Sequence, residues 1–225
     1  MGMRLLIGLE RALIGFLWLA WIVYWIAAAR QTAANRRTES LLTGASYRIP
    51  LLIGIILLVF SHASPPRNGF RLWSLNPFIL AIAVILTVAG LSFAVWARLH
   101  LGKYWSGRIT LRVDHRVIQT GPYALVRHPI YSGLSLALLG TVISLGTVRA
   151  FLGFAFILVS FLRKLALEEN WLRSHFGTEY ELYQKRVRAQ ANMKIRLKTD
   201  AKSACNSIRA IEIPPQLAII IDVTG

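Results

Sequence analysis

Five long stretches without a charged residue constrain this chain more than any other feature of its sequence. They are residues 12–29, 49–66, 72–97, 128–148 and 150–162. A transmembrane helix needs about 20 mostly apolar residues, and the first four stretches approach or exceed that length. The fifth is shorter, and it lengthens only if Arg163 and Lys164 extend their charged ends to the membrane surface. We therefore predict an all-α integral membrane helical bundle of about five transmembrane helices, whose last two form a C-terminal hairpin.

The composition indicates a lipid bilayer, and not nucleic acid, as the partner of the basic residues. Hydrophobic residues make up 55% of the chain and charged residues 16%, whereas about a quarter of a soluble domain is charged. The net charge of +16 would indicate nucleic acid in a soluble protein. On a chain with long apolar stretches it indicates an anionic membrane surface instead. The single cysteine, Cys205, excludes an intrachain disulfide and a multi-thiolate metal site, and we expect no metal.

The positions of the basic residues predict the orientation of the bundle. If there are five spans, every Lys and Arg lies on the same side as the C-terminus except Arg4, Arg11, Arg67, Arg71 and Arg149. Because basic loops tend to stay in the cytoplasm, we expect a multi-pass protein with its N-terminus outside and its C-terminus cytoplasmic. Most histidines and acidic residues lie on that same side, so a catalytic site is expected at the cytoplasmic end of the last hairpin.

The segment from His115 to Gly133, HRVIQTGPYALVRHPIYSG, is the first candidate motif. Its pattern predicts a short extended segment, a turn at Gly121-Pro122, and entry into the fourth span. Pro129 suits the first turn of that helix, where the N–H it lacks would have no partner. Residues 127–131 also have a simpler explanation, because basic and aromatic residues commonly anchor the ends of membrane spans.

The segment from Lys164 to Tyr183, KLALEENWLRSHFGTEYELY, is the second candidate. Lys164 and Glu168 stand four residues apart and share one helix face, and Gly177 suits a helix end. A cytoplasmic amphipathic helix then follows; the residues that we expect to face the membrane are Tyr180, Tyr183 and Val187. An ordinary surface helix with an ion pair explains this pattern as well. The pair Glu168-Glu169, however, lies just beyond a span in a strongly basic region, which favours a cationic ligand or ligand hydroxyls.

Together, the two motifs resemble the isoprenylcysteine carboxyl methyltransferase family of integral membrane proteins. The resemblance covers roughly residues 75–188. It rests on R-H-P-x-Y-x-G at 127–133 followed by E-E-x-x-L-x-x-x-F-G-x-x-Y-x-x-Y at 168–183, a combination more specific than either half. The further matches are Trp105-Ser106, His115, Gly121-Pro122-Tyr123 and Val187.

The resemblance implies methyl transfer from S-adenosylmethionine to a carboxylate, as in isoprenylcysteine, or to another lipophilic or small acceptor. By position, the cofactor-binding residues of the family fall on His115, Arg116, Val117, Ile118, Tyr123, His128, Pro129, Ile130, Tyr131 and Glu168. The implied catalytic residues are Lys164, which would orient the acceptor, and Glu168. Eukaryotic members of the family have arginine where this chain has Lys164, and lysine lacks the planar two-pronged grip of arginine on a carboxylate.

Two other functions agree with the same sequence. A sterol-type membrane reductase has a similar C-terminal helical architecture and would bind NADPH. A non-enzymatic membrane protein would use its basic loops to bind anionic lipid and would bind neither cofactor. The sequence contains no P-loop, no G-x-G-x-x-G turn and no H-E-x-x-H pair. It specifies neither the methyl acceptor nor an oligomeric state.

We divide the chain into three parts on these grounds. Residues 1–74 hold the N-terminal transmembrane helices, residues 75–188 the methyltransferase core, and residues 189–225 a basic tail. Between Ala189 and Arg209 the tail shows no sustained apolar periodicity. Such a segment buries too little surface to offset the entropy of ordering it, so we predict a poorly ordered tail.

Overall fold

The chain folds into a bundle of helices, which confirms the predicted all-α class. The computed structural model describes residues 2–30, 40–63, 71–102 and 118–187, and every regular element within these ranges is a helix. The helices are α1 (Gly2–Ala29), α2 (Leu41–Ala63), α3 (Pro77–Leu101), α4 (Pro122–Leu125), α5 (Pro129–Leu145) and α6 (Val148–Phe176), and residues 178–187 are also helical. The predicted tail, residues 189–225, lies outside the described residues.

Four of the described helices, α1, α2, α3 and α6, are long and apolar enough to cross a membrane. At the last hairpin the helix lengths differ from the lengths of the uncharged stretches. There α5 is the short helix, with 17 residues, or about 25 Å of length against about 30 Å of hydrocarbon. In contrast, α6 continues through Arg163 and Lys164 for 29 residues. Charged residues mark where a helix leaves the membrane, but Arg, Lys, Leu and Glu all favour a helical backbone, so the helix does not end there.

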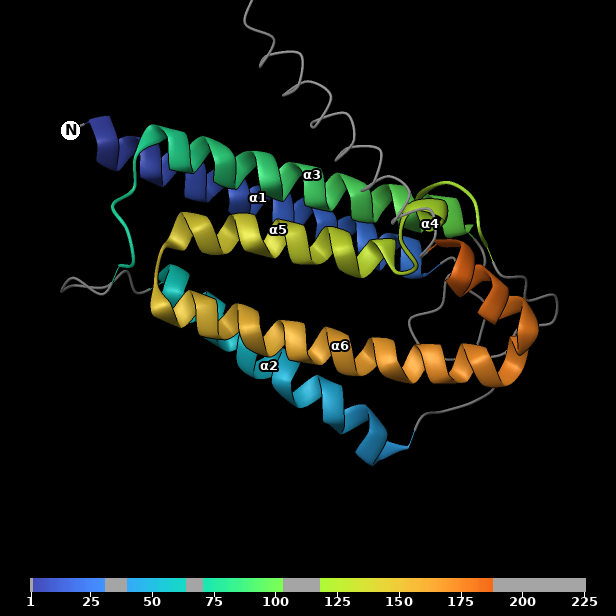
Figure 1. Ribbon diagram of the computed structural model, residues 1–225. Helices are drawn as coiled ribbons and strands as arrows, with labels where there is room; N and C mark the ends of the chain where they lie inside the picture. Colours follow the sequence, from blue (N-terminus) through green and yellow to red (C-terminus); the bar gives the residue numbers. More distant parts are fainter. Residues whose placement is uncertain (1, 31–39, 64–70, 103–117, 188–225) are drawn as a thin grey trace, which may run out of the picture.

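The long helices alternate in direction along the chain, and they pack in pairs (Figure 1). The hairpin helices α5 and α6 each pair mainly with another helix: α5 lies along α3, and α6 lies along α2. The predicted turn at Gly146-Thr147 is present. Gly146 ends α5 with a left-handed φ of 60°, and the Thr147 side chain caps the first turn of α6. The α5–α6 connection is therefore tight, while the two helices diverge toward their other ends.

Small residues bring α3 and α5 into very close contact. A Cβ atom added to Gly90 of α3 would lie 2.4 Å from the backbone nitrogen of Ala137 and 2.5 Å from the carbonyl oxygen of Gly133, both on α5. Where no hydrophobic effect drives helices together, close van der Waals packing of this kind holds them in place. This packing sets the position of the α5 N-terminus, which carries His128, Pro129 and Tyr131.

We expect Gly90→Ala to destabilise the protein by about 1–3 kcal/mol, the usual cost of overpacking a well-packed interface. The added methyl group would have to push α5 away from α3. Gly15→Ala on α1 is the matched control, because nothing lies within 4 Å of the position of its Cβ. Thermal unfolding of both variants in the same detergent would measure the difference. Equal stability of the two variants would contradict this description of the α3–α5 interface.

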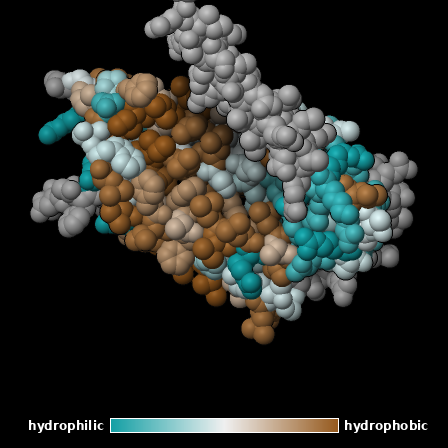
Figure 2. Space-filling model, in the orientation of Figure 1, coloured by the Kyte–Doolittle hydropathy of each residue, from teal (hydrophilic) through white to brown (hydrophobic). Residues whose placement is uncertain are grey.

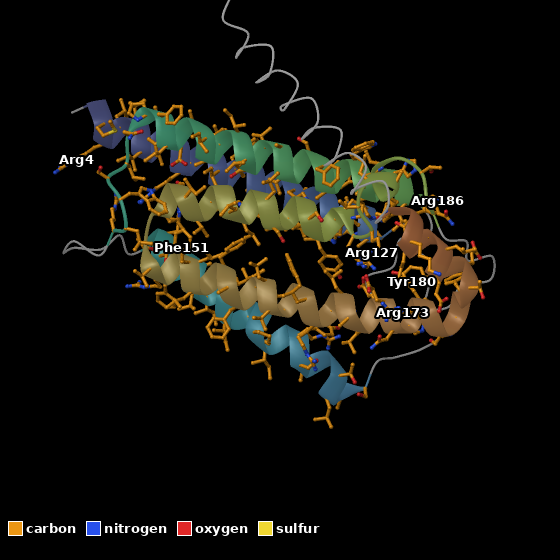
Figure 3. All side chains as sticks on the ribbon, in the orientation of Figure 1. Arg4, Arg127, Phe151, Arg173, Tyr180 and Arg186 are labelled. Carbon is orange, nitrogen blue, oxygen red and sulfur yellow. The ribbon has the colours of Figure 1, made fainter. Side chains whose placement is uncertain are left out.

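Polar and apolar surfaces separate along the bundle. Figure 2 shows a broad hydrophobic surface over the helices and a hydrophilic cluster at the end that carries α4 and residues 178–187. We call this the α4 end. Arg127, Arg173 and Arg186 lie there, whereas Arg4 and Phe151 lie at the opposite end (Figure 3). The start of α5 and the C-terminal ends of α1, α3 and α6 lie toward the α4 end, whereas α2 begins away from α4, below α6 in the view of Figure 1. Residues distant in sequence therefore converge on the α4 end.

Candidate active site

The two motifs of the sequence meet at the α4 end. The Tyr131 hydroxyl, in the first turn of α5, donates a hydrogen bond of 2.8 Å to Oε1 of Glu168 on α6. The Lys164 ammonium, one turn earlier on α6, lies 4.0 Å from the same oxygen. The Lys164 side chain is only 8% exposed and that of Glu168 is 25% exposed. The hairpin thus places a buried cation beside a carboxylate that solutes can reach.

Tyr47 of α2 completes this cluster, and no sequence motif pointed to it. The Lys164 ammonium lies 4.6 Å from the centre of the Tyr47 ring, within the range of a cation–π contact. The Arg48 guanidinium is 5.5 Å from the same ring centre. The Tyr47 side chain is buried. The pairing of α2 with α6 brings this contact about, and pattern analysis of either helix alone gives no signal for it.

A second carboxylate, Glu169, connects three parts of the chain. Its Oε1 lies 2.8 Å from Nη1 of Arg127 and 3.1 Å from Nε2 of His128, and both residues immediately precede α5. Its Oε2 accepts hydrogen bonds from Arg173 at 3.3 Å and from Gln184 at 3.4 Å. The Glu169 side chain is 17% exposed. The sequence analysis grouped this residue with Glu168 as a carboxylate pair for a cationic ligand or ligand hydroxyls, whereas the structure shows Glu169 bound to side chains of the protein itself.

The surroundings of His128 determine its protonation state. Burial lowers its pKa, and the neighbouring Glu169 carboxylate opposes this effect only in part. The imidazole is therefore neutral at pH 7. Because a carboxylate only accepts hydrogen bonds, Nε2 carries the proton and donates it to Glu169, and Nδ1 is left with an acceptor lone pair. Glu169 thereby fixes both the tautomer and the orientation of the ring.

Residues 178–187 pack against α6 and α4 at the α4 end. Tyr180, Tyr183 and Val187 were predicted to face the membrane; that prediction was wrong, because all three are buried within the protein. They pack against Leu172 and Phe176 of α6. An amphipathic helix buries its apolar face against whichever apolar surface it reaches, and here the turn at Gly177 directs it back onto the chain. Tyr183 then donates a hydrogen bond of 2.8 Å to the backbone carbonyl of Tyr123.

Tyr123 lies in α4, close enough to Glu168 for the charge of that carboxylate to affect it. Burial raises the pKa of the Tyr123 phenol, and Glu168 raises it further. Burial also raises the pKa of Tyr183, whose hydroxyl donates a hydrogen bond to the backbone carbonyl of Tyr123. Both phenols therefore stay neutral and can donate hydrogen bonds.

The segment that leads into α4 is held between two other elements. Gln119 accepts a hydrogen bond of 2.8 Å from Arg186, and Thr120 lies 2.8 Å from the His100 ring nitrogen at the end of α3. Gly121 has a φ of 59°, and a Cβ there would approach the His100 ring within 2.7 Å. This position therefore requires glycine on two grounds.

The other sequence-predicted site residues are placed as follows. Pro129 is buried in the first turn of α5. Ile118, which precedes α4 in the chain, and Ile130, in the first turn of α5, are half-buried. His115, Arg116 and Val117 lie outside the described residues. The structure thus brings together Tyr123, His128, Tyr131, Lys164 and Glu168 at one end of the bundle.

Comparisons with known proteins point to one family. The sequence model of the isoprenylcysteine carboxyl methyltransferase family matches residues 82–174. A protein of Oryza sativa subsp. indica named probable protein-S-isoprenylcysteine O-methyltransferase is 30% identical over 168 residues, covering 73% of this chain and 85% of the rice protein. Protein-S-isoprenylcysteine O-methyltransferase B of Arabidopsis thaliana is 25% identical over 167 residues, or 73% of this chain and 82% of that protein.

A third relative matches a shorter segment of the chain at higher identity. The protein-S-isoprenylcysteine O-methyltransferase of Schizosaccharomyces pombe is 41% identical over 75 residues, which cover 33% of this chain and 32% of that protein. None of these names favours a reductase or a non-enzymatic membrane protein. With its apolar spanning helices and these relatives, the chain belongs to the isoprenylcysteine carboxyl methyltransferase family of membrane methyltransferases.

Proposed function

We propose that this protein transfers a methyl group from S-adenosylmethionine to the carboxylate of an isoprenylcysteine-like lipophilic acceptor, and that it does so at the α4 end. The observation that carries this proposal is the pair formed by Lys164 and Glu168, whose opposite charges lie 4.0 Å apart beside Tyr131. Such a pair suits an anionic acceptor and a cationic sulfonium donor side by side. The relatives named as protein-S-isoprenylcysteine O-methyltransferases support the same pairing of substrates.

The residues present are suited to S-adenosylmethionine. Glu168 is partly exposed, and a carboxylate has about four acceptor sites, so it can accept bonds from ribose hydroxyls or from an amine in addition to Tyr131. The neutral His128 and the phenols of Tyr123 and Tyr131 supply further polar atoms and aromatic faces. Aromatic faces attract a cationic sulfonium. Pro129, Ile130 and Ile118 would contribute the apolar wall of the same site.

The proposed methyl transfer requires no proton transfer from the acceptor. Bound S-adenosylmethionine supplies an electrophilic methyl group on a positively charged sulfur. Transfer of this methyl group to an acceptor carboxylate oxygen would break the carbon–sulfur bond and leave its electron pair on sulfur. Since the carboxylate is already ionised, no general base is required. Lys164 holds the acceptor anion, while Tyr131 and Glu168 orient the donor, and catalysis comes mainly from alignment and exclusion of water.

The same proposal places the α4 end in the cytoplasm. The basic residues at that end include Arg127, Arg173 and Arg186 (Figure 3), which agrees with the tendency of basic segments to remain cytoplasmic. The soluble cofactor would then enter from the cytoplasm, and a lipophilic acceptor from the bilayer. In this orientation the N-terminus of α1 is outside. The proposed methyltransferase core is residues 75–188.

Cofactor affinity tests the proposal directly. We expect detergent-solubilised protein to bind S-adenosylhomocysteine in a calorimetric titration, and Glu168→Ala to weaken that binding about tenfold, the effect of losing one hydrogen bond to a charged group. Glu179→Gln on the exposed face of residues 178–187 is the control. Titration with NADPH provides the comparison with a reductase. Binding of NADPH without binding of S-adenosylhomocysteine would refute the proposed function, and an unchanged affinity in Glu168→Ala would remove Glu168 from the cofactor site.

A further inference from the structure

We propose that Tyr47 of α2 is a positioning residue for the methyl acceptor: its ring face holds the Lys164 ammonium in place to receive an acceptor carboxylate. This inference rests on the proposed function, because it gives Lys164 the role of binding the acceptor anion. It extends the site beyond residues 82–174, which match the family model, to a helix from the N-terminal part of the chain.

The geometry shows why Lys164 needs such support. Lysine has a flexible four-carbon stem and no preferred direction for its charge. The Lys164 side chain is 8% exposed, and its ammonium lies 4.6 Å from the centre of the Tyr47 ring and 4.0 Å from Oε1 of Glu168. Tyr47 is itself buried on α2, so its ring is a fixed surface and not a mobile side chain.

The distance to Glu168 matters for the same reason. A separation of 4.0 Å is at the outer edge of an ion pair, whereas a charge-assisted hydrogen bond measures about 2.7–2.9 Å. If Lys164 closed onto Glu168, the two charges would neutralise each other and the acceptor would meet no cation. Attraction to the Tyr47 face competes with that closure. An ammonium carries three donor hydrogens, and the proposal assigns one of them to the acceptor carboxylate.

The charges around the cluster favour an anion over a neutral acceptor. From α2, Arg48 adds a second cation whose guanidinium is 5.5 Å from the Tyr47 ring centre. From α6 come Lys164 and Glu168, and from α5 comes the neutral Tyr131 hydroxyl, which already bonds to Glu168. Lys164 and Arg48 are thus two cations near the Tyr47 ring, and Glu168 is the carboxylate beside Lys164. These two cations would attract an incoming carboxylate.

Binding of a matched pair of probes tests this inference. The probes are N-acetyl-S-farnesylcysteine and its carboxamide, which differ in charge but hardly in shape, titrated into solubilised protein saturated with S-adenosylhomocysteine. We expect the unaltered protein to prefer the carboxylate, and Lys164→Met to lose that preference. Tyr47→Leu, which keeps an apolar side chain but removes the ring face, should reduce the preference about 5- to 30-fold, the range of a desolvated cation–π contact. Tyr47→Phe should restore most of it.

The controls separate the inference from the function on which it rests. Tyr24→Leu replaces a tyrosine of α1, a helix that packs mainly on α3, and should leave the preference as it was. The affinity for S-adenosylhomocysteine should be the same in all Tyr47 variants, whereas a general loss of structure would lower it. If the unaltered protein does not distinguish the two probes, the proposed carboxylate acceptor is wrong. If Lys164→Met loses the preference and Tyr47→Leu keeps it, the acceptor assignment survives and the role of Tyr47 is refuted.

Discussion

Replacing Lys164 by alanine is expected to lower turnover by about 10- to 1000-fold while leaving cofactor affinity close to that of the unaltered protein. This is the scale on which enzymes lose activity when one charge-stabilising or positioning contact is removed. The loss is expected in turnover because the proposal assigns the Lys164 ammonium to the acceptor, whereas it assigns the hydrogen-bonded pair of Tyr131 and Glu168 to the cofactor. Lys164→Arg should retain much more activity, since the charge is kept although its geometry changes.

The competing explanation is that Lys164 only stabilises α6 through Glu168 and Tyr47. In that case, Lys164→Ala would lower expression or thermal stability, and the folded fraction would have normal specific activity. Arg163→Ala is the matched control: it removes the neighbouring positive charge from an exposed position of the same helix. Specific activity and unfolding temperature should be measured on the same preparations. Normal activity with an uncharged residue at 164 would also end the argument for a carboxylate acceptor.

The second large effect is expected at Glu169, to which the proposal assigns no contact with either substrate. Glu169→Gln keeps the shape of the side chain but removes the charge that orients Arg127 and His128 at the start of α5. We expect kcat/KM to fall about 100-fold, because a displacement of about 1 Å in a catalytic group can cost that much. The affinity for S-adenosylhomocysteine should fall as well, since His128 loses its fixed tautomer and orientation. Initial rates and calorimetric titration would measure both quantities.

A double-mutant cycle shows whether Glu169 acts through Arg127. If the two residues form one unit, Arg127→Gln combined with Glu169→Gln should cost much less than the sum of the single variants, because coupled residues are not additive. Glu179→Gln serves as the control for loss of a carboxylate from an exposed position near the same end. Additive losses would show that Glu169 does not position the α5 N-terminus through Arg127.

The helices were easier to predict from the sequence than their ends. Uncharged stretches identify membrane-spanning segments because lipid provides no partner for charged groups. The same signal misjudged α5 and α6, since the end of an apolar stretch is not the end of a helix. The true ends depend on local geometry: the left-handed Gly146 ends α5, and Gly177, with a φ of 48°, ends α6.

The site was predictable to the extent that it depends on topology. Two ends of a hairpin must return to one face of the membrane, so the convergence of Tyr131 and Glu168 follows from the placement of the two motifs. The membrane-facing position predicted for Tyr180 and Tyr183 was wrong, because an apolar helix face indicates only that it will be buried and not which surface will bury it. Here the ends of α4 and α6 bury it.

The sequence by itself determined the helical membrane class, the number of apolar stretches and the motifs that resemble the methyltransferase family, because each of these depends on residues that are close together in the chain. The tertiary structure alone decided that Tyr47 meets Lys164 and that Glu169 joins Arg127, His128 and Gln184. These contacts depend on which helix packs against which. That choice is made by close packing between small residues, Gly90 with Gly133 for α3 and α5 and Gly54 with Gly153 for α2 and α6. It leaves no periodic signal in any one helix alone.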